Sequence, residues 1–246
     1  MTIYDDAVAL AADLETPEGV SGLCPLVILL HGFSSARNRI HTLQTAAAMR
    51  AEGFATLRFD LYGHGESGGE FGKHTLYKWI SNTMAVIDHA RSLGYTDLYL
   101  SGHSQGGLVA ALVAGMEPDR IRGLVLRAPA FMIPRCAREG ELLGFRFDPE
   151  NVPDAVPAQD GLRLDGNYIR VAQAIRAEET AARFKGPVLI LHGEEDDVVP
   201  PEDSRRMAAL YANCELAVMR GETHHYDRDP EGMMNLIRAF CRKIKS

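Results

Sequence analysis

The chain has 246 residues, 46% of them hydrophobic and 24% charged, which is typical of a single globular domain with a substantial core. Its formal net charge of -7 argues against nucleic acid or an anionic membrane as a partner, because both need a cationic surface. No basic segment precedes an apolar run of membrane length, so we expect a cytoplasmic protein without a signal peptide or a membrane span.

The first half of the chain alternates between strand and helix patterns. Apolar and polar residues alternate loosely over Ala7–Leu14 before a Pro-Glu-Gly turn, which predicts an edge strand. Helical spacing of apolar residues covers 40–49 and 76–90, and Gly53 and Gly94 stand where these helices should end. Continuous apolar runs, typical of strands buried on both faces, cover 26–30, 54–59, 98–101 and 121–127.

The alternation stops over about 131–183, where prolines and charged clusters are frequent and only Tyr168–Glu179 looks helical. A connection of that length is unusual in a compact domain unless it has a function, so we expect an insertion that acts as a lid. The sheet pattern then resumes with strands at 187–192 and 215–219 and helices at 204–211 and 230–244. We therefore expect one α/β domain over 1–246, with a mostly parallel sheet covered by helices on both faces.

The strand at 98–101 leads through Gly102-His-Ser104-Gln-Gly106 directly into a helix of small apolar residues. This strand, turn and helix is the setting of a nucleophile elbow, in which Ser104 stands exposed on a strained turn. A Cβ at Gly102 or Gly106 would collide with the neighbouring strand or helix. The backbone N–H of Gln105, at the helix N-terminus, would point at an oxyanion formed by attack of Ser104.

A second oxyanion donor is expected after the strand at 26–30, which ends in His31-Gly32-Phe33. The backbone N–H of Phe33 fits that role, and its side chain would form a wall of the acyl pocket. We interpret His31 as a buried histidine at the end of a strand, with its ring hydrogen-bonded to the backbone.

An acid and a base follow Ser104 in the order Ser, Asp, His, which is the order of this architecture. The acid lies in the loop 193–200 and the base in the loop 221–226, each just after a predicted strand, so parallel packing would gather them at one edge. Residue pattern alone leaves two choices open, because Asp196 adjoins Asp197 and His224 adjoins His225.

Nearly the whole chain resembles the α/β-hydrolase superfamily. The matching segments are His31-Gly-Phe33, Gly102-His-Ser-Gln-Gly-Gly107, Gly193-x-x-Asp196-x-x-Val-Pro200 and Gly221-x-x-His224. This resemblance implies the α/β-hydrolase fold with Ser104, Asp196 and His224 as the triad. Within the superfamily the chain is most similar to bacterial cinnamoyl (feruloyl) esterases, since Asp148–Asp154 and Gly166–Gln173 resemble their lid segment.

In those esterases a lid tyrosine, which corresponds to Tyr168, binds the phenolic hydroxyl of the cinnamoyl ring with help from an acidic residue. Cys136 stands where that acid is expected, so the resemblance leaves open whether the carboxylate partner is replaced. Tyr168 has a second interpretation, as a helix residue that packs the lid onto the body of the domain.

These patterns predict a serine carboxylesterase that hydrolyses esters of hydroxycinnamic acids such as ferulate, p-coumarate and caffeate. A broad short-chain acyl or monoacylglycerol esterase is the alternative, and a non-catalytic binding protein on the same fold is a further one. The four cysteines are widely separated, which indicates neither a zinc site nor a disulfide framework. We expect no metal and no organic cofactor, a small-molecule ester as substrate and, by analogy with similar esterases, a possible homodimer.

Overall fold

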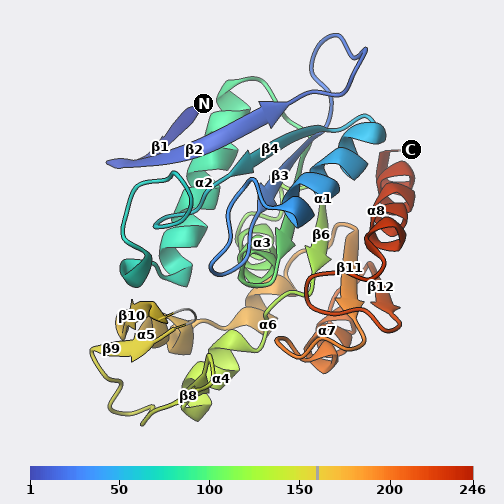
Figure 1. Cartoon of the computed structure of the whole chain (residues 1–246). Helices are drawn as coiled ribbons and strands as arrows, with labels where there is room; N and C mark the ends of the chain where they lie inside the picture. The colour runs from blue at the N-terminus through green and yellow to red at the C-terminus, as the bar shows by residue number, and fades with distance from the viewer. Residues whose placement is uncertain (159–160, 246) are drawn as a thin grey trace.

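The structure is a computed structural model that describes residues 1–158 and 161–245. Its centre is an eight-stranded sheet in the order β1-β2-β4-β3-β5-β6-β11-β12 (Figure 1). The pairs β1–β2 and β2–β4 are antiparallel, and every pair from β4 to β12 is parallel. The prediction of a mostly parallel sheet is therefore confirmed. The strands are β1 (Thr2–Asp5), β2 (Val8–Glu15), β3 (Leu26–Leu30), β4 (Ala55–Phe59), β5 (Leu98–His103), β6 (Gly123–Arg127), β11 (Val188–Gly193) and β12 (Cys214–Met219).

The strand at the amino-terminal edge of the sheet is not the one predicted from the sequence. The segment expected as the edge is β2, which lies between β1 and β4, and the edge strand is β1. Only four residues long, β1 shows one buried side chain, Ile3, beside an exposed Tyr4. That is too short a run for alternation to reveal from the sequence.

Helices cover both faces of the sheet, as expected. The face beneath α1 and α8 buries a core with Met49 from α1 and Ile237 and Phe240 from α8. The other face buries a larger core with Trp79 from α2, Leu108 from α3 and Met207 from α7. The helices of the body are α1 (Ile40–Ala51), α2 (Leu76–Ser92), α3 (Gln105–Met116), α7 (Pro201–Ala208) and α8 (Pro230–Lys245), with a 3-10 turn at η1 (Phe71–Lys73). No helix in the described ranges is long and apolar enough to cross a bilayer.

The chain between β6 and β11 forms an insertion that lies beyond the carboxyl ends of these strands (Figure 1). It contains more structure than expected. The predicted helix over Tyr168–Glu179 is two helices, because Ile175 adopts an extended backbone between them. Residues 159–160 of the expected insertion lie outside the described residues. Its elements are α4 (Ile133–Glu139), β7 (Glu141–Leu142), β8 (Phe145–Arg146), β9 (Ala155–Pro157), β10 (Arg163–Asp165), α5 (Asn167–Ala174) and α6 (Ala177–Ala181).

Apolar residues of the insertion such as Val156, Leu164 and Ile169 pack into the larger core, and polar side chains add further contacts. The side-chain amide of Gln173 in α5 donates to the carbonyl oxygens of Ala137 (3.2 Å) and Pro149 (2.8 Å). The far end of the insertion packs tightly on the body, because a Cβ on Gly115 of α3 would lie 2.0 Å from the carbonyl oxygen of Thr180 in α6. The position of the insertion over the sheet edge is thus fixed at its interior and at its end.

Candidate active site

Ser104 stands on a sharp turn between β5 and α3, with φ +55° and ψ -122°. Two glycines make the turn possible, as predicted. A Cβ on Gly102 would lie 2.3 Å from the carbonyl oxygen of Gly106, and a Cβ on Gly106 would lie 2.2 Å from that of His31. The structure therefore holds Ser104 in a conformation that non-glycine residues rarely adopt, at the amino end of a helix.

The structure brings Asp196 and His224 together although 28 positions separate them. Nδ1 of His224 lies 2.7 Å from Oδ2 of Asp196, and the other carboxylate oxygen accepts the backbone N–H groups of Val198 (2.9 Å) and Val199 (2.8 Å). His192, at the end of β11, places its Nε2 3.2 Å from the same Oδ2.

Burial opposes the charged form of Asp196. Hydrogen bonds from His192, His224 and the backbone outweigh that effect and hold the pKa of its carboxyl well below the usual range. Asp196 is therefore an anion at neutral pH, as an acid that orients an imidazole must be.

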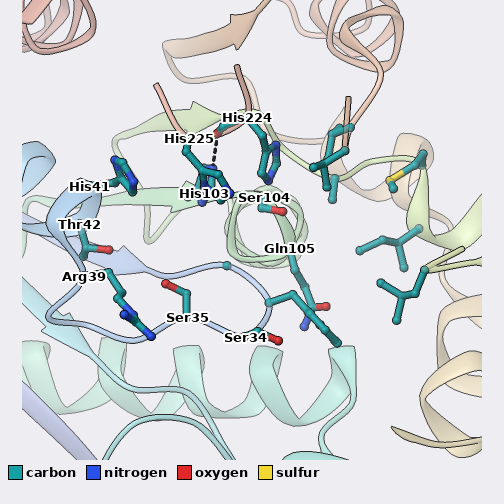
Figure 2. Close-up of a pocket in the computed structure, with 18 of the residues that line it drawn as sticks. Ser34, Ser35, Arg39, His41, Thr42, His103, Ser104, Gln105, His224 and His225 are labelled. Carbon is teal, nitrogen blue, oxygen red and sulfur yellow. Dashed lines mark hydrogen bonds between the residues drawn. The ribbon is translucent and has the colours of Figure 1, made fainter. Parts of the chain in front are cut away.

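The loop that carries His224 is anchored to the sheet at two further points. Nε2 of His103, the residue before Ser104, donates to the carbonyl oxygen of His224 over 2.9 Å (Figure 2). The buried hydroxyl of Tyr226 donates to the carbonyl oxygen of Leu191 in β11 over 2.8 Å. Burial, with His224 and Arg127 nearby, lowers the pKa of His103, so its ring is neutral.

Sequence reasoning missed the positioning roles of His103, His192 and Tyr226. His103 and His192 could have been noticed as polar residues at the ends of apolar strands. No sequence pattern distinguishes Tyr226.

Ser104 and His224 line the same pocket, a cavity of about 480 Å³. Figure 2 shows the ring of His224 directed toward Ser104. In the described part of the chain, Ser104 Oγ has no hydrogen-bond partner, so no bond joins the two residues in this conformation. Such contacts often tighten only when substrate is bound.

The backbone N–H groups of Phe33 and Gln105, which line the pocket with Ser104, have no acceptor among residues 1–158 and 161–245. They are the two groups that the sequence predicts as oxyanion donors. Gly32 lies tight against Ser104, because a Cβ there would come within 3.1 Å of the serine Cβ. His31 is buried, with Nδ1 2.8 Å from the carbonyl oxygen of Gly32 and Nε2 accepting the N–H of Leu61 over 3.0 Å, which confirms the interpretation from sequence.

One side of the pocket is mostly apolar and is lined largely by residues of the insertion. We call this side the insertion arm, and define it as Phe33, Met132, Ile133, Leu142, Leu143 and Tyr168. Tyr168 is fully buried, and its hydroxyl donates to the side-chain oxygen of Gln105 over 2.7 Å. The ring of Phe33 packs edge-on against Tyr168, with centroids 6.3 Å apart.

Cys136 lies in α4 and is half-buried, but it is absent from the described lining of the pocket. Burial raises the pKa of its thiol, which is therefore neutral at physiological pH. The hydroxyl of Tyr168 bonds to Gln105 of the body and not to a group at position 136.

Asp196 and His224 each have a neighbour of the same residue type. Asp197 is exposed and Asp196 is buried. His225 is exposed. Its ring meets that of His224 edge-on at 5.2 Å and stacks on His41 at 5.7 Å, in the wall of the pocket.

Comparison with protein families places this site in context. Residues 23–153, more than half of the chain, match the family model described as serine aminopeptidase, S33. The chain belongs to this family of α/β-hydrolases. The match covers the elbow and the Phe33 loop, while Asp196 and His224 lie beyond it.

Solved structures extend the similarity to the whole chain. A structure of Est1E from Butyrivibrio proteoclasticus with ferulic acid bound is 45% identical, covers 99% of this chain and 98% of its own, and superposes with a TM-score of 0.97. A monoacylglycerol lipase from Paleococcus ferrophilus is 26% identical over 96% of this chain and 98% of its own, with a TM-score of 0.71. The human mitochondrial palmitoyl-protein thioesterase ABHD10 is 24% identical over 89% of this chain and 72% of its own length.

Proposed function

We propose that this hydrolase cleaves carboxylic esters of hydroxycinnamic acids, with Ser104, His224 and Asp196 as its catalytic triad. The observation that carries the proposal is the 45% identity, over 99% of the chain, to a structure that holds ferulic acid. That similarity includes the insertion, and the insertion supplies most of the insertion arm of the pocket.

The geometry supports a two-step mechanism through an acyl-enzyme. With its Nδ1–H donated to Asp196, the ring of His224 has Nε2 free to accept the proton of Ser104 as the serine attacks the ester carbonyl. The N–H groups of Phe33 and Gln105 stabilise the oxyanion of the tetrahedral intermediate. His224 then gives the proton to the departing alcohol, and water, activated by the same ring, releases the acid from Ser104.

The insertion arm suits an aromatic acyl group. Its aliphatic side chains and the rings of Phe33 and Tyr168 provide the flat apolar contact that a cinnamoyl ring requires. The hydroxyl of Tyr168 and the side chain of Gln105, whose Nε2 is buried without a partner, provide polar groups for a phenolic hydroxyl. We infer that the insertion, at about 131–183, acts as the lid that determines acyl preference in a single domain over 1–246.

The test compares specificity constants on methyl ferulate, methyl p-coumarate, methyl cinnamate and p-nitrophenyl butyrate. The proposal predicts a preference for the hydroxylated cinnamates over butyrate, after correction for the more reactive p-nitrophenol leaving group with p-nitrophenyl ferulate as the matched ester. A preference for butyrate by orders of magnitude would instead identify a short-chain or monoacylglycerol esterase, to which the similarity with the Paleococcus lipase points.

A further inference from the structure

Arg127, the last residue of β6, carries a guanidinium that is buried and unpaired. We propose that this guanidinium binds a small monovalent anion of the chloride class inside the domain, next to the loop that carries His224. The inference adds a ligand site that the proposed ester hydrolysis does not use, so it can be tested whether or not that function holds.

The register of the sheet places the Arg127 side chain in the core beneath α1 and α8. Arg127 pairs with His103 of β5 and with Leu191 of β11. Residues in register on neighbouring strands direct their side chains to the same face, and Leu191 packs in the core under these helices. Tyr226 lies in the same core, where its hydroxyl donates to the carbonyl oxygen of Leu191 over 2.8 Å. Arg127, which is only 1% exposed, is therefore buried where the His224 loop is anchored to the sheet.

The protein itself does not balance the charge of Arg127. Its Nε and Nη1 are buried without a hydrogen-bond partner. Within residues 1–158 and 161–245 its guanidinium forms no ion pair and lies over no aromatic ring. Burial lowers the pKa of Arg127 to about 10, so the group is still a cation at neutral pH. Burial also raises the pKa of the neighbouring Tyr226 phenol, which is therefore neutral.

The buried carboxylates of the two nearest loops are engaged elsewhere. Asp196 interacts with His192 and His224. Glu222 accepts the backbone N–H groups of Thr223 (2.9 Å) and Asp229. Neither carboxylate forms an ion pair with Arg127.

Arg58 shows how the same chain accommodates another buried arginine. It is 5% exposed, and its Nη2 lies 3.0 Å from Oε2 of Glu15. An unpaired charge in an apolar core is strongly unfavourable, so Arg127 requires a counter-ion that the chain does not supply. One guanidinium among apolar side chains is balanced by one negative charge, and a close-packed core admits a small ion more readily than a phosphate. These two conditions select a monovalent anion such as chloride.

Thermal unfolding in sodium chloride and in sodium gluconate, at equal ionic strength, tests the proposal. Gluconate is too large to enter the core, so it reports the general effect of salt alone. Between about 10 and about 500 mM salt, we expect the thermal midpoint of the wild type to rise about 5 °C more in chloride than in gluconate. Mass action gives a shift of this size for a dissociation constant on the order of 10 mM. Equal midpoints in the two salts would overturn the proposal.

One variant and one control assign the effect to Arg127. Arg127→Met removes the charge with a side chain of similar length, and its midpoint should be the same in both salts. Arg91→Met removes an exposed charge from α2 and should keep the wild-type difference between the salts. A chloride-specific rise that persists in Arg127→Met would contradict the assignment.

Bromide in crystals of the wild type locates the ion without any variant, so the test remains available if Arg127→Met does not fold. We expect an anomalous difference peak in contact with the Arg127 guanidinium. An ordered water at this position, or bromide confined to the surface of the protein, would overturn the proposal.

Discussion

The carboxyl edge of the sheet and the insertion above it contribute differently to the pocket. Ser104 and Asp196 follow β5 and β11, which are paired on both sides, and His224 follows the edge strand β12, which is paired with β11. Backbone hydrogen bonds between strands therefore fix the positions from which these three residues extend. The insertion has strands of only two or three residues and is held by side-chain contacts such as those of Gln173. The difference suggests that the sheet edge determines whether the ester is cleaved, and the insertion determines which ester.

The largest expected effect comes from the sheet edge. Asp196→Asn should reduce kcat by about 10³- to 10⁴-fold on every ester, because the amide no longer fixes the tautomer and charge of His224. Asp197→Asn is the matched control, since Asp197 is the exposed neighbour, and it should keep wild-type kcat. Equal losses in the two variants would mean that the acid has been assigned to the wrong residue of the pair.

Two buried histidines, His31 and His74, should make the free energy of unfolding depend on pH. Burial lowers the pKa of His31 to about 4 and that of His74, whose ring lies 5.2 Å from Tyr168, to about 3. Between the ordinary value of 6.5 and these values the unfolded chain binds more protons than the folded one, so stability falls as pH is lowered. For His31 alone the loss from pH 6.5 to 4 is on the order of 3 kcal/mol.

Denaturant titrations at several pH values between 7.5 and 4.5 measure this dependence. His74→Gln should give a smaller decrease over the same range, whatever its effect on absolute stability. An unfolding free energy that is constant over this range would contradict the neutral, buried state of these rings.

A smaller effect is expected from the contact that positions the base. His103→Gln should lower kcat about tenfold or less on all esters alike, because one hydrogen bond to the His224 carbonyl is lost or lengthened. KM and the ratio between ferulate and butyrate esters should stay constant. A change in that ratio would show that His103 also affects acyl preference, and the division between the two regions would need revision.

The smallest effect is expected in the insertion. Tyr168→Phe should reduce the ratio of kcat/KM for methyl ferulate to that for methyl cinnamate by about three- to tenfold, since only the hydroxylated ring loses a polar contact. If Tyr168 only packs the insertion onto the body, both substrates will change together and the thermal midpoint will fall.

The sheet edge was predictable from sequence because its signals are local and redundant. An apolar run such as 26–30 identifies a buried strand, and the glycines around Ser104 identify the elbow. The choice between His224 and His225 was different, because adjacent residues share every local signal and required the resemblance to a family. The stacking of His225 on His41 joins residues 184 positions apart, and no local pattern records such a contact.

The insertion was predictable in extent but not in structure. Elements of two or three residues, such as β7 and β8, are shorter than any period that a sequence pattern can show. The seven-residue α4 begins at Ile133 with Pro134 in its first turn, and its charged residues conceal the apolar face. Likewise, the bond between Tyr168 and Gln105 joins residues 63 positions apart, so it appears only when the insertion is folded over the elbow.

The most direct test of the central claim is to trap the acyl-enzyme. The wild type and Ser104→Ala would be mixed with p-nitrophenyl ferulate, quenched in acid within the first turnovers, digested and analysed by mass spectrometry. The account predicts a feruloyl group on Ser104 in the wild type, and in the variant no adduct and a loss of turnover of about 10⁴-fold or more. A feruloyl group on another residue, or substantial turnover by Ser104→Ala, would contradict it.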